Sequence, residues 1–585
     1  MSETMTGAEM VIRALQDQGV KHIFGYPGGS VLPLYDVIFQ QDVIQHILVR
    51  HEQGAAHAAE GYARSTGKVG VVLVTSGPGS TNAVTGLADA FADSIPLVCL
   101  TGQVPTQLIG TDAFQECDTV GITRNCTKHN YLVKNVADLP RIMHEAFYIA
   151  SSGRPGPVVV DLPKDVQFAT GTYYKPENSS HKTYRPGVKG DPERIRKAVD
   201  MMAAAARPVL YTGGGVINSG PKASETLRAL VKATGFPITS TLMGLGAYPG
   251  DDDAFLGMLG MHGTYEANLT MHDSDLIVAV GARFDDRVTG RLDAFAPTAR
   301  IIHIDIDPSS INKIVPVDLA IIGDCGSVLE DMLAAWTGGG KTANPSLKAW
   351  WKQINGWRAR NSLAYKPSTE FIKPQYAIER LYAATKDRDT YITTEVGQHQ
   401  MWAAQFYKFR EPNRLMTSGG LGTMGYGFPS AIGVQTAHPE SLVIDIAGDG
   451  SIQMNIQELA TAAQHNLPVK IFILNNEYLG MVRQWQELLH GGRFSHSHTA
   501  AMPDFIKLAE AYGATGIRCT KPEDLDGAIE KMLNTPGVVI LDCIVEKLEN
   551  CLPMIPSGKA HNDMLLNDST EDIGSVIDEK GRALV

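Results

Sequence analysis

The sequence has few of the features that mark secreted, membrane-spanning or nucleic-acid-binding proteins. Its seven cysteines include no C-x-x-C pair, which argues against a disulfide framework and a cysteine zinc site. Its longest strongly apolar runs, such as residues 69–75 and 471–474, are far shorter than the roughly 20 residues that span a bilayer. Lys and Arg total 51 against 63 for Asp and Glu, and the net charge of −12 disfavours a general nucleic-acid binder. Residues 1–18 lack the pattern of a targeting signal, so we expect a cytoplasmic protein without membrane or nucleic-acid partners.

What remains is the composition of an ordinary globular protein, with 585 residues of which 44% are hydrophobic and 19% are charged. This length predicts about three or four domains. Two stretches, residues 169–190 and 337–345, are typical of linkers because they are polar or rich in glycine and proline. They predict domains over residues 1–170, 190–336 and 370–555, followed by a tail over residues 556–585.

Short apolar, β-branched runs alternate with helical patterns throughout the chain. Near-continuous apolar strands separated by helices are typical of parallel sheets covered on both faces. We therefore predict three doubly wound α/β domains, with ligands bound by the loops that follow the strands. The clearest runs are residues 44–49, 69–75, 97–100, 209–212, 276–280, 301–305, 442–447 and 469–474.

Two glycine-rich matches to nucleotide-binding motifs are weak. Residues 420–425 read G-L-G-T-M-G, but residues 414–418 before them make a poor strand, and Asp445 falls inside the next strand. Residues 338–342 read G-G-G-K-T, but they follow a helical pattern and lack the earlier glycine of a phosphate-binding loop. We expect neither a nicotinamide fingerprint nor a phosphate loop at these positions.

The most specific pattern is a βαβ unit over residues 442–485. Its first strand runs into Gly448-Asp449-Gly450-Ser451, a helical pattern over residues 456–465 crosses over, and its second strand ends at Asn475-Asn476. Because parallel strands end at the same sheet edge, Asp449 and Asn476 are expected to converge. A carboxylate and an amide oxygen suit Mg²⁺, and glycines beside them let the backbone approach a diphosphate. Taken singly, each residue is also explained as a turn aspartate or a capping asparagine.

This unit resembles the thiamine diphosphate binding motif, and residues 395–399 (EVGQH) and 419–427 are similar to the same family's diphosphate domain. Thiamine enzymes typically use a glutamate that faces N1′ of the aminopyrimidine. Glu52 fits, because it follows the strand over residues 44–49. That hydrogen bond favours the imino tautomer, whose 4′ nitrogen removes the C2 proton of the cofactor. On position alone, Glu52 is equally explained as a carboxylate at a helix N-terminus.

Nearly the whole chain resembles the catalytic subunits of the acetohydroxyacid synthase (acetolactate synthase) family. The matching stretches include residues 25–29 (GYPGG), 75–82 (TSGPGSTN), 102–105, 111–116, 154–157, 161–165 and 475–485 (NNEYLGMVRQW). The resemblance implies that pyruvate is decarboxylated and its two-carbon unit is joined to a second 2-ketoacid. Pyruvate as acceptor gives 2-acetolactate, and 2-ketobutyrate gives 2-aceto-2-hydroxybutyrate. It also implies thiamine diphosphate, Mg²⁺, an FAD that is not consumed, at least a homodimer whose subunits share each site, and a separate small regulatory subunit.

The resemblance also implies a role for individual residues. Glu52, Gly29, Gln115 and Met424 are the implied catalytic residues, and Met424 is the apolar residue that bends the cofactor. The implied metal ligands are Asp449, Asn476 and Tyr478, the last through its backbone carbonyl. The implied thiamine diphosphate site is Tyr26, Pro27, Glu52, Pro78, Asn82, Val396, Gly397, Gln398, His399, Gly422, Met424, Gly448, Asp449, Gly450, Ser451, Asn476, Gly480 and Met481.

The implied FAD and substrate sites lie largely in the middle segment. FAD is expected to contact Arg154, Gly213, Gly214, Gly215, Leu259, Gly260, Met261, His262, Gly281, Ala282, Arg283, Asp285, Arg287, Val288, Asp305, Ile306, Gly323, Asp324 and Cys325. The substrate is expected to meet Met261, Arg287, Trp485 and Lys164, with Pro105 and Ala113 beside Lys164 at the rim of the channel. The helical spacing of Trp485 is also compatible with core packing alone.

Three other interpretations remain open at this point. The middle segment could be free of flavin, because flavin-free acetolactate synthases share the architecture. The chain could be another thiamine enzyme, such as glyoxylate carboligase or a flavin-dependent oxidase, although glyoxylate carboligase lacks the glutamate that Glu52 supplies here. A non-catalytic protein that kept the fold is disfavoured by the presence of Glu52, Asp449 and Asn476 together.

Overall fold

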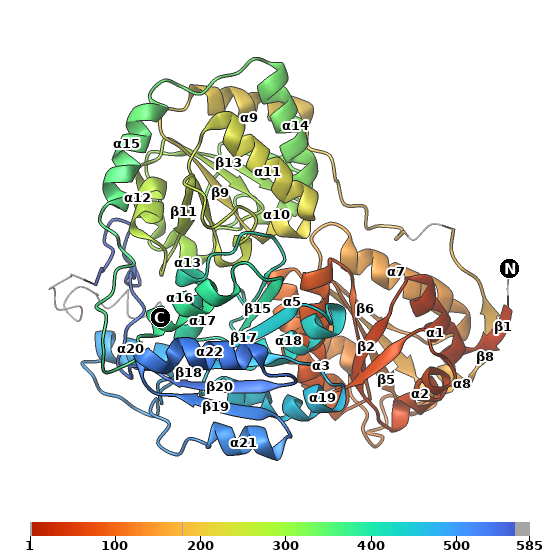
Figure 1. The fold of residues 1–585 in the computed structure, drawn as a ribbon. Helices are drawn as coiled ribbons and strands as arrows, with labels where there is room; N and C mark the ends of the chain where they lie inside the picture. The colour runs from red at the N-terminus through yellow and green to blue at the C-terminus, as the bar shows by residue number, and fades with distance from the viewer. Residues whose placement is uncertain (1–2, 178–179, 568–585) are drawn as a thin grey trace.

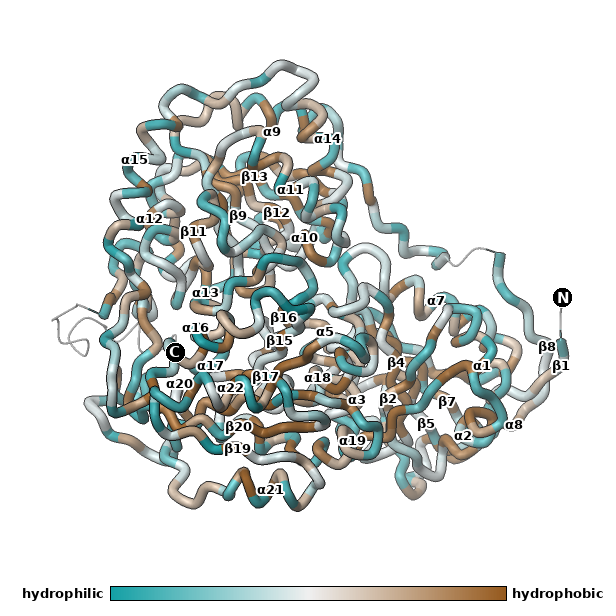
Figure 2. Tube along the Cα trace, viewed as in Figure 1, coloured by the Kyte–Doolittle hydropathy of each residue, from teal (hydrophilic) through white to brown (hydrophobic). Residues whose placement is uncertain are grey.

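The computed structural model describes residues 3–177 and 180–567. Within them the chain forms three α/β domains, each built on a six-stranded parallel sheet with helices on both faces (Figure 1). The prediction of three doubly wound α/β domains is confirmed. Apolar residues gather along the strands and the inner sides of the helices (Figure 2). None of the helices in these residues combines the length and the apolar character that a membrane crossing requires.

The first domain has the strand order β3-β2-β4-β5-β7-β6. Its first helix, α1 (Gly7–Asp17), begins at a capping box between Thr6 and Glu9 and buries its apolar face. The strands are β2 (His22–Tyr26), β3 (Gln45–Leu48), β4 (Gly70–Val74), β5 (Leu97–Gln103), β6 (His129–Leu132) and β7 (Pro157–Pro163). The other helices are α2 (Leu32–Phe39), α3 (Glu52–Thr66), α4 (Pro78–Asn82), α5 (Val84–Asp93), α6 (Thr119–Thr123), α7 (Leu139–Ser151) and α8 (Lys164–Phe168).

The middle domain has the strand order β11-β10-β9-β12-β13-β14. Its strands are β9 (Pro208–Thr212), β10 (Ile238–Ser240), β11 (Phe255–Met258), β12 (Leu276–Val280), β13 (Arg300–Asp305) and β14 (Leu319–Ile322). Its helices are α9 (Pro192–Ala204), α10 (Gly214–Asn218), α11 (Pro221–Thr234), α12 (Tyr265–Asp273), α13 (Asp286–Thr289), α14 (Cys325–Gly338) and α15 (Leu347–Arg358).

The last domain has the strand order β16-β15-β17-β18-β20-β19. Its strands are β15 (Thr390–Thr394), β16 (Leu415–Met416), β17 (Leu442–Gly448), β18 (Lys470–Asn475), β19 (Thr515–Cys519) and β20 (Val539–Ile544). Its helices are α16 (Pro374–Thr385), α17 (Gln398–Phe406), α18 (Gly427–Ala437), α19 (Leu459–Gln464), α20 (Gly480–Leu489), α21 (Phe505–Ala511) and α22 (Leu525–Asn534).

The first and last domains pack through α3 and α18, whose backbones approach each other closely at glycine residues. A Cβ atom at Gly433 would lie 1.8 Å from the carbonyl oxygen of Ala58, and one at Gly61 would lie 2.1 Å from that of Ser430. Residues of both domains therefore share one hydrophobic core. This contact fixes the carboxyl ends of the two sheets relative to each other.

Three segments differ from their predicted form. The expected linker over residues 169–190 contains β8 (Thr170–Tyr173), which pairs antiparallel with β1 (Glu3–Thr6). The helix expected over residues 456–465 begins earlier, as a 3₁₀ helix (Ile452–Glu458), before α19. Helix α14 extends two residues into the expected linker over residues 337–345. Strand β8 depends on its distant partner β1, because this short polar strand has no local apolar pattern. The expected tail lies within the described residues only as far as residue 567.

Candidate functional site

Asp449 and Asn476 lie at the adjacent carboxyl ends of two neighbouring strands, as their spacing predicts. Strand β17 ends at Gly448 and pairs in parallel with β18, which ends at Asn475. One oxygen of Asp449 accepts a hydrogen bond from the backbone N–H of Asn476, and the other accepts one from the Thr499 hydroxyl, both at 3.4 Å. Burial raises the pKa of Asp449 to about 7. These bonds are long, and no basic side chain among the described residues forms an ion pair with Asp449.

The side-chain carbonyl oxygen of Asn476 is only partly used by hydrogen bonds among the described residues. Its Oδ1 accepts one hydrogen bond, from the backbone N–H of Tyr478 at 3.1 Å, and its Nδ2 donates to Oε1 of Gln398 at 3.3 Å. A Cβ atom at Gly480 would lie 2.2 Å from that same Gln398 oxygen, so glycine at the start of α20 allows the Gln398 side chain to approach closely. Since a carbonyl oxygen has two lone pairs, Asn476 can still bind a cation beside Asp449.

Glycines around this pair leave room for a ligand close to the backbone. A Cβ atom at Gly448 would lie 2.6 Å from Nδ1 of His399, and Gly397, before α17, has a φ of 153°. Burial lowers the pKa of His399 to about 3, so its ring is neutral. The arrangement joins backbone N–H groups, a cation position and small residues, which is what a Mg²⁺ diphosphate requires.

A large cavity of about 790 Å³ runs from Val396 and Gly397 of the last domain into the middle domain, and Asp449 and Asn476 are not among its lining residues. Its lining from the last domain includes Val396, Gly397, Gly422, Met424, Met481 and Trp485. Met481 and Trp485 are four positions apart on α20 and therefore lie on one face of the helix. The middle domain closes the cavity with the loops after β9, β12 and β13. All the residues predicted for FAD line it except Gly260 and Gly323.

The wall formed by the middle domain lets a ligand approach the backbone and favours an anion. Gly281 follows β12 with a φ of 60°, and a Cβ atom there would lie 2.6 Å from the Cα of Gly215. Arg154 reaches this wall from the first domain, where its guanidinium donates to Ser94 at 2.8 Å. Burial is the main cause that lowers the pKa of Arg154, and the positive charge of Arg283 lowers it further. Two arginines that repel each other in a partly buried wall would be stabilised by a phosphate or diphosphate.

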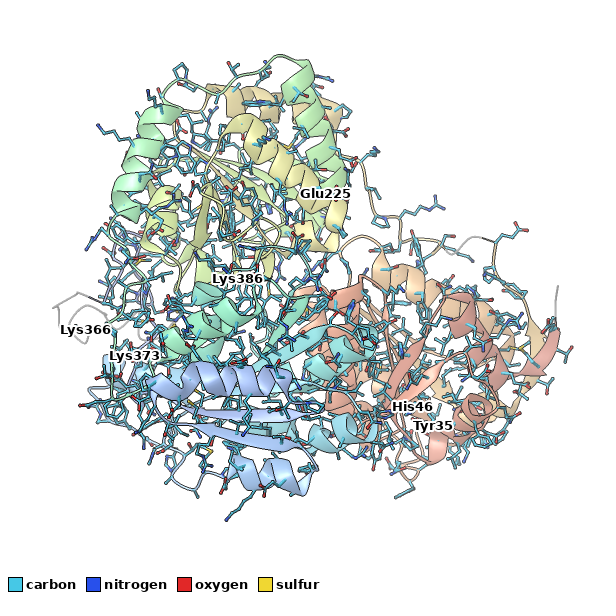
Figure 3. The ribbon with its side chains drawn as sticks, in the orientation of Figure 1. Tyr35, His46, Glu225, Lys366, Lys373 and Lys386 are labelled. Carbon is cyan, nitrogen blue, oxygen red and sulfur yellow. The ribbon has the colours of Figure 1, made fainter. Side chains whose placement is uncertain are left out.

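A segment after β20 ties several of these elements together. Gln398 donates to Gln484 of α20 at 2.8 Å and to the carbonyl of Glu549 at 3.1 Å. Lys373, at the left edge of the last domain in Figure 3, forms an ion pair with Glu549 at 2.6 Å. Farther along, the backbone N–H of Ile555 donates to the carbonyl of Met261 at 2.7 Å. The predicted acceptor residues Met261 and Trp485 are therefore linked through one stretch of chain.

Glu52 belongs to a separate group at the carboxyl end of the first sheet. It is the first residue of α3, and its Oε2 accepts a hydrogen bond from Asn82 at 3.0 Å and contacts His51 at 3.4 Å. Burial alone would raise the pKa of Glu52, but the interactions with His51 and Asn82 outweigh burial and lower it. Gln115, with a φ of 60°, packs against Gly77 in the same group. Like Glu52, the predicted residues Tyr26, Pro27, Gly29, Pro78, Asn82, Gln115 and Lys164 do not line the large cavity.

Comparisons with known proteins decide the family. Models of the thiamine pyrophosphate enzyme match the chain in three parts: the N-terminal TPP binding domain over residues 5–122, the central domain over residues 195–332 and the C-terminal TPP binding domain over residues 395–543. The acetolactate synthase isozyme 3 large subunit of Escherichia coli K12 is 52% identical over 574 residues, which cover 97% of this chain and 99% of that protein. The chain belongs to the acetolactate synthase family of thiamine pyrophosphate enzymes.

Two further relatives extend the likeness within the acetolactate synthase family. The acetolactate synthase large subunit of Haemophilus influenzae is 50% identical over 571 residues, covering 97% of this chain and 99% of that protein. The mitochondrial acetolactate synthase catalytic subunit of Saccharomyces cerevisiae is 48% identical over 583 residues, covering 96% of this chain and 84% of that protein. The identity therefore extends through the first, middle and last domains alike.

Several groups beside the site of this acetolactate synthase family member had no signal in the sequence. Asp93, Ser94, Met243, Gln400 and Met401 also line the cavity. They come from helix ends and turns that only tertiary packing brings to the site. A φ of 62° at Ser94 is likewise invisible in the sequence, because serine rarely adopts it. A buried cluster of acidic residues behind this wall was also not expected, and it is described below.

Proposed function

We propose that this protein is an acetolactate synthase catalytic subunit, which decarboxylates pyruvate and joins the two-carbon unit to a second 2-ketoacid. With pyruvate as acceptor the product is 2-acetolactate, and with 2-ketobutyrate it is 2-aceto-2-hydroxybutyrate. This would be the first common step of branched-chain amino acid biosynthesis. The observation that supports it most strongly is the full-length identity to acetolactate synthases together with an intact Glu52 group and an intact Asp449–Asn476 pair.

Thiamine diphosphate, when bound, supplies the nucleophilic carbon and the electron sink for decarboxylation. The residues of the last domain would hold its diphosphate through Mg²⁺ on Asp449, Asn476 and the backbone carbonyl of Tyr478. The uncompensated, buried carboxyl group of Asp449 supports this, because a cation would stabilise its ionised form. Glu52 would hold a proton against the aminopyrimidine, since Asn82 and His51 contact its Oε2 and leave Oε1 for a ligand.

We place the acceptor 2-ketoacid between Met261, Arg287 and Trp485. All three line the cavity, and Arg287 has the guanidinium that a carboxylate needs. Met261 and Trp485 would contact the alkyl group of the acceptor, so the larger acceptor 2-ketobutyrate depends on them most. We expect Trp485→Leu to lower the ratio of 2-aceto-2-hydroxybutyrate to 2-acetolactate when both ketoacids compete. Val482→Ala on the exposed face of α20 is the control, and an unchanged ratio in the Trp485 variant would remove Trp485 from the pocket.

FAD is our proposed occupant of the middle part of the cavity. Three features support an elongated ligand that contains a diphosphate. The cavity extends into the middle domain, glycine residues form part of its wall, and Arg154 and Arg283 supply positive charge. Asp305 ends β13 and lines the cavity, where a carboxylate suits a ribose hydroxyl. A flavin spectrum in the purified protein would test this assignment independently of catalysis.

We further propose a dimer in which Glu52 of one subunit completes the Asp449 site of the other. Exposed apolar side chains near the Glu52 group, such as Phe114 at 89% exposure, support a contact with a second subunit there. A separate small regulatory subunit is proposed because the relatives are named large subunits. The seven free cysteines fit a reducing cytoplasm.

The direct test is to incubate the purified protein with pyruvate, Mg²⁺, thiamine diphosphate and FAD. Acidification converts 2-acetolactate to acetoin, which is measured by colour or mass spectrometry. We expect acetoin to accumulate only when the sample is acidified after the reaction. Acetaldehyde as the sole product, or no product, would reject the synthase assignment in favour of a simple decarboxylase or a binding protein.

A further inference from the structure

The loop over residues 418–424 forms one wall of the large cavity. It connects β16 to the turn before α18, and Ser418, Gly419, Gly420, Gly422 and Met424 all line the cavity. Met424, at the end of the loop, is the residue that we place against thiamine diphosphate. The position of Met424 therefore depends on what holds this loop.

Two aspartates on α5 of the first domain hold the loop from behind. The carboxylate of Asp93 accepts hydrogen bonds from the backbone N–H groups of Gly419 at 2.9 Å and Gly420 at 2.7 Å. A Cβ atom at Gly420 would lie 2.8 Å from Oδ1 of Asp93, so glycine permits this close approach. Arg64 lies 3.9 Å from the same carboxylate and supplies the opposite charge.

Asp89, one helical turn earlier on α5, binds the other part of the loop. Its Oδ1 accepts hydrogen bonds from the hydroxyls of Ser418 at 2.5 Å and Thr423 at 3.1 Å. The Ser418 hydroxyl in turn accepts from the backbone N–H groups of Gly422 at 2.9 Å and Thr423 at 2.8 Å. Asp89 thus orients the one hydroxyl that closes the loop on itself.

The second oxygen of Asp89 faces another buried acid. Oδ2 of Asp89 and Oε2 of Glu60 have no conventional hydrogen-bond donor among the described residues, and both side chains are fully buried. His57, also buried, lies with its Nδ1 2.9 Å from Oε1 of Glu60, and the three residues offer ligand atoms within 4.8 Å of one another. Burial raises the pKa of both Glu60 and Asp89, so one proton shared between their carboxyl groups satisfies these oxygens.

We propose that Asp89 and Asp93 are positioning residues that hold the loop over residues 418–424, and through it Met424, in the shape that binds thiamine diphosphate. The inference rests on the proposed cofactor site. A loop that is ordered before the cofactor binds loses little conformational entropy on binding, and it holds Met424 in a single position. The acceptor residues Met261 and Trp485 pack instead against a separate apolar cluster formed by Leu488, Leu489, Met554 and Leu565, so we expect the two aspartates to act on the cofactor and not on the acceptor.

The variants Asp93→Asn and Asp89→Asn test this inference. An amide has one acceptor oxygen, so Asp93→Asn leaves one of the two loop N–H groups without an acceptor. We expect the dissociation constant of thiamine diphosphate with Mg²⁺, measured by fluorescence quenching on the cofactor-free full chain, to rise about tenfold or more. With saturating cofactor, kcat should fall while KM for pyruvate stays within about twofold of its original value.

Glu60→Gln is the matched control. It makes the same carboxyl-to-amide change in an equally buried residue that does not touch the loop, and its amide can donate to Oδ2 of Asp89 in place of the shared proton. We expect this variant to bind thiamine diphosphate within about twofold of the unmutated chain. An equal loss of cofactor affinity in Glu60→Gln, Asp89→Asn and Asp93→Asn would overturn the inference in favour of general loosening of the domain contact.

Ser418→Ala keeps the inference testable if an aspartate variant does not fold. It removes only the hydroxyl that Asp89 binds. We expect it to weaken cofactor binding, and to weaken it no further when combined with Asp89→Asn, because both changes break one linked contact. Unchanged cofactor affinity in folded Ser418→Ala and Asp93→Asn would overturn the inference. If the unmutated chain binds thiamine diphosphate without forming acetolactate, and the variants lose that binding, the proposed function fails while this inference stands.

Discussion

At the scale of single residues, Glu52 and Asp449 show how surroundings give two carboxyl groups different properties. Both follow strands at the carboxyl end of a sheet. The hydrogen bond from Asn82 and the contact with His51 lower the pKa of Glu52 in spite of burial, whereas burial raises that of Asp449 to about 7. Glu52 is therefore ready to accept a proton or a hydrogen bond, and Asp449 gains most from a bound cation.

We expect Glu52→Gln to slow the exchange of the C2 proton of bound thiamine diphosphate by at least about a hundredfold, because a neutral amide cannot exchange a proton with N1′ and so does not favour the imino tautomer. The exchange is measured by transfer into D₂O followed by NMR of the released cofactor. Mg²⁺ affinity should be unchanged, since Glu52 does not contact the Asp449–Asn476 pair. An exchange rate equal to that of the unmutated protein would show that Glu52 only caps α3.

A second single residue, His46, makes the stability of the folded protein depend on pH. Its Nε2 is 2.8 Å from the Tyr35 hydroxyl, and the two side chains lie together in the first domain (Figure 3). Burial, and then the charge of His465, lower the pKa of His46 to about 4. An unfolded chain takes up this proton near its ordinary value of about 6.5, so stability is full above that pH and falls as the pH drops toward 4.

We expect His46→Gln to reduce this loss, because glutamine can accept the Tyr35 hydrogen bond and does not titrate. Near pH 5 the difference in unfolding free energy between variant and parent should shift by about 2 kcal/mol in favour of the variant, relative to pH 8. Urea unfolding at both pH values measures it. His490→Gln, on an exposed histidine, is the control, and a difference that is independent of pH would contradict the assigned burial effect.

At the scale of helices and strands, the contact between α3 and α18 is set by glycine. Gly433→Ala would place a methyl group 1.8 Å from the Ala58 carbonyl oxygen, which is backbone and cannot move aside cheaply. We expect the variant to lose about 2–4 kcal/mol of stability, measured by denaturant unfolding. Gly527→Ala on exposed α22 has nothing within 4 Å of its new Cβ and should gain about 0.5–1 kcal/mol from helix propensity. Equal effects in the two variants would show that the helices do not pack as closely as described.

The same scale shows what the sequence could predict. The apolar strands and the convergence of Asp449 with Asn476 were predictable, because strand pattern and βαβ geometry are local rules. Strand β8 and the 3₁₀ start before α19 were not, because β8 pairs with the distant β1, and Glu458 of the 3₁₀ helix accepts a hydrogen bond from the backbone of Arg50 in the first domain. The Asp93 and Asp89 contacts to the loop were likewise hidden, since they join residues more than three hundred positions apart.

At the scale of the whole molecule, the residues that we propose for the thiamine diphosphate site come from two domains of the chain. The Glu52 group lies at the first sheet and the Asp449–Asn476 pair at the last, and neither group is among the residues that line the cavity shared with the middle domain. Figure 1 shows the first and last domains side by side, with the middle domain above them. In the dimer that we propose, a second copy of the chain completes each site, and twofold symmetry gives two such sites.

Mixing two inactive variants tests this arrangement. In a dimer of one Glu52→Gln chain and one Asp449→Asn chain, one site combines the intact Glu52 with the intact Asp449, and the other site has lost both. If subunits exchange at random in equal amounts, half the dimers are mixed and each has one of two sites intact, so about a quarter of the parent activity should return. The control replaces the second chain by the Glu52→Gln, Asp449→Asn double variant, which restores no site. Mixed dimers that are confirmed by native mass spectrometry yet remain inactive would place Glu52 and Asp449 in the same subunit's site.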